Sequence, residues 1–411
     1  MIARDVHAPP GDAIADVEIP PLFVEPDPVL GALRERATAA MAPFTASDFS
    51  RWDQEGVYPE EVFEAIRDAG LTGLTVDREL GGEGGGVLEA CTVLEELSYH
   101  GMAAGLILQM FVNGPPRAIW HLGTAEQHDR YLRDAVSGKR YFSIAMTEPQ
   151  AGSATTELTT ELRPSGDGFT LHGEKCYITG ALRANTFLVF CRAPGTRGSR
   201  GLGAVVVERG QDGFTIEAGA PKMGGNSVQE AELFFDGVRI DAGAVILPPE
   251  PDSTRAATIM IKQFNPERCG NAAMVLGTAR AALESAIRYS RVRQQFGREL
   301  CEFQGIQWKI ADMAVRYESA RLLLDRAARS DDGGFPEIRA TMMAKLAANE
   351  AAEYICREAI QIHGHHGYTR ALPVERYYRE VRGSWLGGGT IETNRNMIAS
   401  SVIGRRFSQR G

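Results

Sequence analysis

The sequence predicts an α+β protein in which helices come first, strands fill the middle and helices return to the end of the chain. Apolar residues recur with the helical period in the first third and in the last part of the 411 residues, whereas short apolar or alternating runs lie between about 140 and 248. Separate blocks of helices and strands disfavour the alternating units of a Rossmann fold. The chain exceeds the size at which one core stops growing, so we expect two or three domains.

The N-terminal block has recognisable boundaries. Residues 1–27, rich in proline and aspartate, are expected to form an extended arm. An N-terminal α-helical domain is expected over 28–138. In it, one helix runs from Pro59 to a stop at Gly70, and another opens with a capping box at Thr124 and Gln127.

A middle β-domain, a sheet or barrel, is expected over 139–250. Its predicted strands are YFSIAM, GFTLHG, KCYITG, TFLVFCR, GAVVVERG, GFTIEA and ELFFDGVRI. After the turn-rich PPEPDSTR, long alanine-rich segments with the helical period predict a C-terminal α-helical bundle over 251–411.

Composition narrows the class of protein. The net charge of −9 gives no sign of a nucleic-acid surface, and six scattered cysteines without metal or redox spacing are typical of free thiols in a reducing cytosol. The N-terminus has no basic region followed by an apolar run, and no segment is apolar for long enough to cross a bilayer. We therefore expect a cytoplasmic protein that binds neither nucleic acid nor membrane.

Several segments could contact a ligand, and each has an ordinary structural interpretation as well. TEPQAGS is a hydroxyl-rich loop or a tight turn, and the tyrosine of KCYITG could belong to the core. RQQFG follows a helix end that favours cations, and the glycines of SWLGGGTIETNR permit close approach or simply form a loop. QIHGHHGYTR clusters three histidines, but no carboxylate or cysteine stands beside them, so we expect no metal site.

The chain resembles the acyl-CoA dehydrogenase family of flavoproteins over roughly residues 28–406. The resemblance rests on the order of five motifs: TEPQAGS, KCYITG, RQQFG, QIHGHHGYTR with PVERYYR, and GGGTIETNR. It implies the family's fold of an N-terminal helical domain, a middle β-domain and a C-terminal helical bundle, with FAD as cofactor. Because the family's FAD site spans two subunits, it also implies a homo-oligomer, a tetramer or a dimer. Electrons would pass to an electron-transfer flavoprotein or to oxygen.

The resemblance implies roles for five residues of the β-domain. Met146, Thr147 and Ser153 match the loop that lies along the flavin and its phosphates, and Ser153 is also expected to contact substrate. Tyr177 and Thr179 match the positions that flank the isoalloxazine ring.

In the C-terminal region, the resemblance implies contacts from a second subunit. Arg293 matches the arginine that reaches the FAD pyrophosphate of a neighbouring subunit, with Phe296 packing nearby. His365 departs from the family, which commonly has a second glycine there. Four further positions match the surroundings of the adenosine half: Gln361, Gly364, Thr390 and Glu392.

The family's reaction requires a carboxylate over the α-carbon of an acyl thioester, where it removes a proton while the β-hydrogen leaves as hydride. At the position that usually carries this base, the chain has Gly388. In the isovaleryl-CoA and long-chain branches the base instead precedes an arginine, and the matching residues are Glu267 and Arg268, with Asn265 as a further expected substrate contact. Alternatively, Asn265 caps a helix that begins at Pro266, and Glu267 is only an acidic residue of its first turn.

We therefore expect an FAD-dependent dehydrogenase that introduces an α,β double bond into an acyl thioester of CoA or of a carrier protein, with Glu267 as base. One alternative is a flavoenzyme of specialised metabolism on the same scaffold, which decarboxylates as it dehydrogenates or which oxygenates its substrate. Another is a non-catalytic flavin-binding subunit of a hetero-oligomer.

Overall fold

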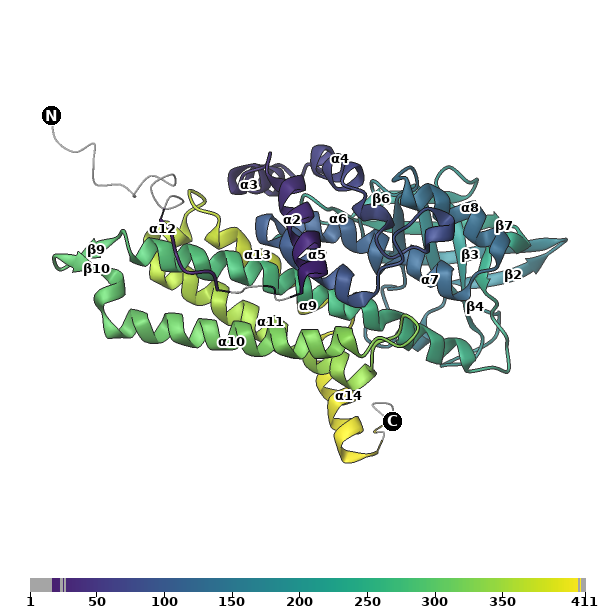
Figure 1. Cartoon of the computed structure of the whole chain (residues 1–411). Helices are drawn as coiled ribbons and strands as arrows, with labels where there is room; N and C mark the ends of the chain where they lie inside the picture. Colours follow the sequence, from purple (N-terminus) through teal and green to yellow (C-terminus); the bar gives the residue numbers. More distant parts are fainter. Residues whose placement is uncertain (1–16, 23–24, 26, 406, 408–411) are drawn as a thin grey trace.

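The structure, a computed structural model, describes residues 17–22, 25, 27–405 and 407. Helices precede an eight-stranded sheet, and a long helical bundle follows it, so the predicted α+β order is confirmed. Figure 1 shows the sheet at one end of the molecule and the bundle extending away from it. Most of the predicted N-terminal arm, residues 1–16, 23–24 and 26, lies outside the described residues. Within the described part of the chain, no helix combines the length and apolar character needed to cross a bilayer.

The N-terminal helices begin and end where local signals place them. Thr124 accepts a hydrogen bond from the backbone of Gln127, whose side chain accepts one in return, so the predicted capping box is confirmed. Gly70, with φ of 74°, follows the end of its helix as predicted. The helices are α2 (Pro28–Met41), α3 (Ala46–Glu55), α4 (Glu60–Asp68), α5 (Val87–His100), α6 (Met102–Val112), α7 (Pro115–Leu122) and α8 (Ala125–Val136).

The sheet has the strand order β6-β7-β3-β2-β4-β5-β8, and β1 pairs in parallel with β4. Two predicted strands, GFTLHG and KCYITG, form one long strand, β3, which continues through Gly173 with φ of 143°. A Cβ there would lie 2.5 Å from the Thr160 hydroxyl. The strands are β1 (Phe142–Ala145), β2 (Glu161–Ser165), β3 (Gly168–Thr179), β4 (Thr186–Arg192), β5 (Leu202–Glu208), β6 (Phe214–Ala218), β7 (Glu230–Ile240) and β8 (Val245–Leu247).

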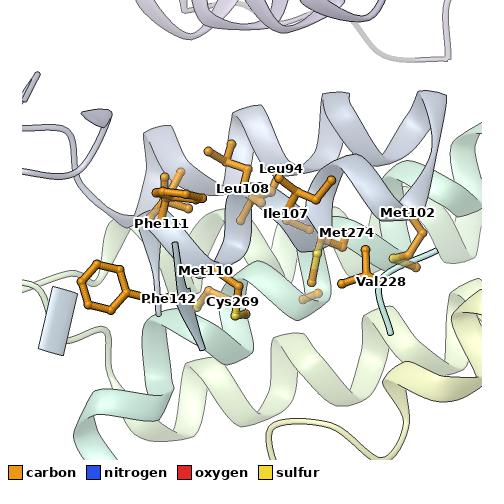
Figure 2. Packing of buried hydrophobic residues seen from close by; sticks show 14 of the residues in the cluster. Leu94, Met102, Ile107, Leu108, Met110, Phe111, Phe142, Val228, Cys269 and Met274 are labelled. Atoms are coloured by element: carbon orange, nitrogen blue, oxygen red, sulfur yellow. The ribbon is translucent and has the colours of Figure 1, made fainter. Parts of the chain in front are cut away.

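The bundle is built around one helix, α9, which packs against α5 and α11. Glycine permits this packing, because a Cβ at Gly277 would lie 2.0 Å from the Glu95 carbonyl oxygen of α5. Figure 2 shows Met274 and Cys269 of α9 beside Ile107 and Met110 of α6. The elements are α9 (Arg255–Ser290), the hairpin β9 (Gln294–Gln295) and β10 (Arg298–Glu299), α10 (Gln304–Arg329), α11 (Ile338–His363), α12 (His365–Tyr368), α13 (Val374–Ser384) and α14 (Ile391–Ile403).

One alternative from the sequence is wrong. Helix α9 begins at Arg255 and runs through Pro266, so Pro266 is an interior residue and Asn265 caps nothing. A proline inside a helix leaves the carbonyl four residues earlier without its N–H donor. Glu267 therefore lies in the middle of a buried helix and is not a first-turn acid.

Candidate active site

The glycine run that precedes α14 packs against the middle of α9. Gly388 and Gly389 have φ of 65° and 88°, conformations that favour glycine. A Cβ at Gly388 would lie 3.6 Å from Nζ of Lys345 and 3.7 Å from Cγ of Arg268. The glycine loop, residues 387–389, thus faces two cationic side chains, from α9 and α11.

Arg268 joins α9 to this loop. Its Nε donates to the carbonyl of Gly388 at 2.9 Å, and one terminal nitrogen donates to Oδ1 of Asn265 at 3.0 Å and to the carbonyl of Ile261 at 3.3 Å. Asn265 is fully buried and also donates to the carbonyl of Pro336. The amide of Asn265 is therefore engaged within the protein, where it orients Arg268.

Lys345 holds the same loop from the other side. This α11 lysine is fully buried, and its ammonium group donates to the carbonyl of Gly387 and, at 2.5 Å, to that of Gly389. The amide of Asn394 donates to the carbonyl of Gly389 as well, at 3.1 Å. Cations from two helices thus bind three successive carbonyls.

Glu267 is half-buried next to this cluster. Burial raises the pKa of Glu267 to about 7, against the opposing effect of the positive charges of Arg268 and Lys345. The backbone of Glu267 is fixed by Gln109 of α6, whose amide donates to its carbonyl at 3.0 Å. A carboxylate that titrates near neutral pH is suited to proton transfer.

A second set of predicted residues gathers at the edge of the sheet. Thr147 accepts a backbone hydrogen bond from Cys176 at 3.0 Å, and the carbonyl of Thr179 accepts one from the hydroxyl of Ser143 at 2.8 Å. Tyr177 lies between these contacts on β3. The structure thus brings Thr147, Tyr177 and Thr179 together.

A buried ion pair shapes the loop that follows β1. Lys175 donates to Glu148 at 2.7 Å and to the carbonyl of Met146 at 3.0 Å, and neither charged side chain is exposed. Glu148 also accepts from the backbones of Thr159 and Thr160. Its pKa is lowered to about 2, because the lysine and these hydrogen bonds outweigh burial. Ser153, at the end of the same loop, is exposed.

Tyr177 and Phe296 share an unusual conformation. They are non-glycine residues with positive φ, 58° and 53°, and their side chains are 71% and 94% exposed. Such a conformation costs about 1–3 kcal/mol and is concentrated at ligand-binding sites. Exposed aromatic rings held in strained positions fit a planar aromatic ligand.

The remaining predicted cofactor contacts lie elsewhere in the chain. Phe296 is at the tip of the β9–β10 hairpin, which Figure 1 shows at the end of the bundle opposite the sheet. Arg293 precedes this hairpin, and Gln361 and Gly364 are exposed at the end of α11. Thr390 caps α14 by accepting from the backbone of Thr393. Glu392 is exposed in its first turn.

The histidines make hydrogen bonds within the bundle. His363 contacts the hydroxyl of Ser285 at 3.1 Å and the carbonyl of Ala359, and His366 contacts the hydroxyl of Tyr289 at 2.9 Å. Burial lowers the pKa of His363 to about 4. Among the residues that the structure describes, no group of three or more histidine, cysteine or acidic side chains could hold a metal ion.

Known proteins match the chain along nearly its whole length. Models of the N-terminal, middle and C-terminal domains of acyl-CoA dehydrogenases match residues 30–139, 143–238 and 257–403. The 3-sulfinopropanoyl-CoA desulfinase of Paraburkholderia xenovorans (strain LB400) is 37% identical over 378 residues, 92% of this chain and 95% of the relative. The chain belongs to the acyl-CoA dehydrogenase family.

Solved structures of related proteins agree with this assignment. The butyryl-CoA dehydrogenase of Megasphaera elsdenii is 30% identical, with a TM-score of 0.87 over 93% of this chain and 100% of that one. A chain from structural work on the electron transferring flavoprotein of Acidaminococcus fermentans has the same identity and TM-score, over 93% and 99%. The predicted three-domain fold and the prediction of an FAD-dependent acyl thioester dehydrogenase are thereby confirmed.

The sheet-edge residues of this acyl-CoA dehydrogenase fit FAD. An exposed tyrosine ring stands beside a hydroxyl-containing loop that the buried Lys175 and Glu148 fix in place. These two residues were not predicted from the sequence, and neither were Gln109 and Lys345. A signal for Lys345 was available, because it shares a helical repeat with the buried Thr341, Ala348, Ala352, Ile355, Ala359 and Ile362.

Proposed function

We propose that Glu267 is the base with which this acyl-CoA dehydrogenase removes the α-proton of its substrate. One observation carries the proposal: Arg268, the residue next to Glu267 on α9, contacts the glycine loop, where Gly388 occupies the position of the family's usual carboxylate. The residue after Glu267 donates directly to the Gly388 carbonyl. Glu267 would then approach the substrate from α9, while the usual base would project from the loop itself.

Proton transfer is the part of the reaction that this chain's residues perform. With a pKa of about 7, Glu267 is partly ionised at neutral pH and basic enough to accept a proton. It takes the α-proton, and the electrons of that C–H bond form the new double bond as the β-hydrogen leaves with its electron pair. The chemistry that bound FAD supplies is acceptance of this hydride.

The other site residues would bind the flavin and the substrate and orient them for the reaction. We propose that Met146, Thr147, Ser153, Tyr177 and Thr179 hold the flavin, with Ser153 also next to substrate. Arg268 would contact the pantetheine arm of an acyl-CoA. Asn265 would act through Arg268 and not by touching substrate, because its amide is already bonded to Arg268 and Pro336.

The rest of the cofactor site would come from a second copy of the chain. The hairpin with Arg293 and Phe296 lies at the far end of the bundle from Tyr177, so one chain does not bring them together (Figure 1). Helix α10 exposes Trp308, Val315 and Leu322 at seven-residue intervals, an apolar stripe available to another subunit.

We therefore propose a homotetramer, with a dimer as the smallest complete unit. Gln361, Gly364, Thr390 and Glu392 would surround the adenosine half of FAD. Light scattering on the purified protein should give the mass of a tetramer or dimer, and a monomer that retains FAD would contradict the shared site.

We propose that the enzyme is cytoplasmic and that it passes electrons to an electron-transfer flavoprotein. All six cysteines are free, as is common in a reducing compartment. Oxygen is the other possible acceptor, and the rates at which air and an electron-transfer flavoprotein reoxidise the substrate-reduced enzyme separate the two.

The experiment that tests the proposed function is anaerobic bleaching of the flavin by a panel of saturated acyl-CoA and acyl-carrier-protein thioesters. We expect bleaching and a product lighter by two hydrogens. Loss of CO2 or incorporation of oxygen, detected by mass spectrometry, would instead support a decarboxylating or oxygenating enzyme. If no thioester bleaches the flavin, the non-catalytic subunit is favoured. Glu267 favours simple dehydrogenation, because loss of CO2 generates a carbanion without a base.

A further inference from the structure

We propose that the N-terminal arm segment, residues 17–22 and 25, is a positioning element for FAD: it holds the end of α9 that presents Arg293 to the cofactor of a neighbouring subunit. This inference rests on the proposed shared site. It gives a role to a part of the chain that precedes the match to the family's N-terminal domain, which begins at residue 30. The segment is attached to the bundle at two places, and arginines make both attachments.

The first attachment lies at the C-terminal end of α9. Nε of Arg288 donates to the carbonyl of Val17 at 3.3 Å, and the guanidinium of Arg291 donates to the carbonyl of Glu18. A guanidinium donates in fixed directions, and residues three apart lie on the same face of a helix. The two arginines therefore set the path of the arm backbone relative to α9. Glu18 is itself exposed, so this attachment uses its backbone.

The same end of α9 leads into the residue that is expected to reach FAD. The backbone N–H of Arg293 donates to the carbonyl of Tyr289 at 2.9 Å, which places Arg293 in the turn that Arg288 and Arg291 attach to the arm. The hydroxyl of Tyr289 contacts His366 of α12 at 2.9 Å, so this turn is also joined to α12. The arm is thus bonded to the turn that determines where Arg293 lies.

The second attachment is a buried charge cluster between α2, α5 and α10. Glu25 contacts Arg34 of α2 at 3.4 Å and Arg321 of α10 at 3.5 Å, and its side chain is 8% exposed. Arg34 and Arg321 both contact Glu95 of α5 as well, at 2.6 Å and 3.6 Å. Removing one partner of a buried ion pair is strongly destabilising, so Glu25 fixes the arm at this end.

The described residues between the two attachments favour a stiff and partly packed connection. Pro20 and Pro21 are adjacent, and proline fixes φ and favours an extended backbone. Leu22 is half-buried and packs against the hydrophobic core. In Figure 1 the segment, in dark purple, runs along the bundle from the side of α12 to α2. A change at one attachment can therefore reach the other.

Glu25→Gln tests this connection, because it removes the charge of the second attachment and leaves α9 untouched. We expect the dissociation constant of FAD for the full-length protein to rise roughly fivefold. Pro21→Gly, at an exposed position, gives the arm more freedom and should raise the dissociation constant by a similar factor. Glu18→Gln is the matched control, because only its carbonyl is used, and it should change the constant by less than about twofold.

Thermal unfolding distinguishes positioning from a purely structural role. An arm that only stabilises the bundle would lower the unfolding temperature of the arm variants and leave their dissociation constants for FAD at the wild-type value. An unchanged dissociation constant in Pro21→Gly would overturn the inference, even if Glu25→Gln does not fold.

A double variant identifies the residue through which the arm acts. If the arm positions Arg293, either arm variant should add little to the loss of FAD affinity already caused by Arg293→Ala. Full additivity would refute the positioning role alone. Wild-type FAD affinity in Arg293→Ala would instead refute the shared site on which the inference rests.

Discussion

Two buried lysines hold backbone loops in this protein, and they differ in the carboxylate beside them. Lys175 of β3 donates to the Met146 carbonyl and pairs with Glu148 at 2.7 Å. Lys345 of α11 donates to carbonyls of the glycine loop, and Glu267 interacts with it through charge. The pKa of Glu148 is about 2, whereas that of Glu267 is about 7.

The difference separates a structural carboxylate from a reactive one. Glu148 has a lysine, two backbone N–H groups and side-chain donors around it, so it remains ionised at every physiological pH. Glu267 is half-buried, has no such bonds among the described residues, and can exchange a proton near neutral pH. We infer that the incompletely satisfied carboxylate is the one used for chemistry.

Breaking the structural pair should have the largest effect on stability. Glu148→Gln leaves Lys175 buried without its counter-charge, so the free energy of unfolding should fall by about 3–5 kcal/mol in urea titrations at pH 7. The exposed pair between Asp167 and Arg239 is the control, and Asp167→Asn should cost less than about 1 kcal/mol.

The pH dependence of this effect has a defined sign. The folded pKa of Glu148 lies below its ordinary value of 4.5, so its stabilisation is present above about pH 4.5 and disappears as the pH falls towards 2. The stability difference between wild type and Glu148→Gln should therefore shrink over that range. A constant difference would contradict the pairing.

Moving the base should have a smaller net effect. Glu267→Gly with Gly388→Glu returns a carboxylate to the family's usual position, where a Cβ meets no atom closer than 3.6 Å. Because Gly388 has φ of 65° and the new base is displaced, we expect single-turnover reduction roughly a hundredfold slower than wild type. The rate of flavin reduction by the double variant should still exceed the rate of Glu267→Gly alone. Equal rates for the single and double variants would show that position 388 does not reach the α-carbon.

Removing a predicted cofactor contact should weaken FAD binding. Arg293→Ala loses charge-assisted hydrogen bonds to the pyrophosphate, worth about 1.5–3 kcal/mol, so the dissociation constant of FAD should rise roughly tenfold to a hundredfold. Arg298→Ala, on the same hairpin, is the matched control. Equal FAD content in the two variants would show that Arg293 does not contribute to FAD binding.

The smallest effect is expected at Tyr177. Tyr177→Gly relieves a positive φ of 58°, so the FAD-free protein should be more stable by about 1 kcal/mol, while FAD binds less tightly. Tyr177→Phe keeps both the ring and the strain and should match wild type in thermal unfolding. A less stable Tyr177→Gly apoprotein would show that the conformation is not strained.

Local signals in the sequence predicted much of the fold. The capping box at Thr124 and the helix stop at Gly70 each depend on only a few neighbouring residues, and both are confirmed. Strand β2 was missed because ELRPS is short, polar and contains a proline. The alternative in which a helix begins at Pro266 was wrong because Pro266 resembles a first-turn residue, whereas α9 begins at Arg255 and continues through it.

The site was less accessible to sequence reasoning. Motif order pointed to Glu267 and Gly388, but the contacts of Lys345 and Gln109 arise only when α6, α9, α11 and the glycine loop meet. The limits 1–27, 28–138, 139–250 and 251–411 stay predictions, as do the roles of the individual site residues.

The most direct test of the central claim compares wild type with Glu267→Gln in anaerobic single turnover with a saturated acyl-CoA. The substitution keeps the shape of the side chain and removes its basic oxygen. With unchanged FAD content, flavin reduction should slow by on the order of a hundredfold to ten-thousandfold. Glu64→Gln, on the exposed face of α4, should reduce at the wild-type rate. Equal rates for wild type and Glu267→Gln would contradict the assignment of the base.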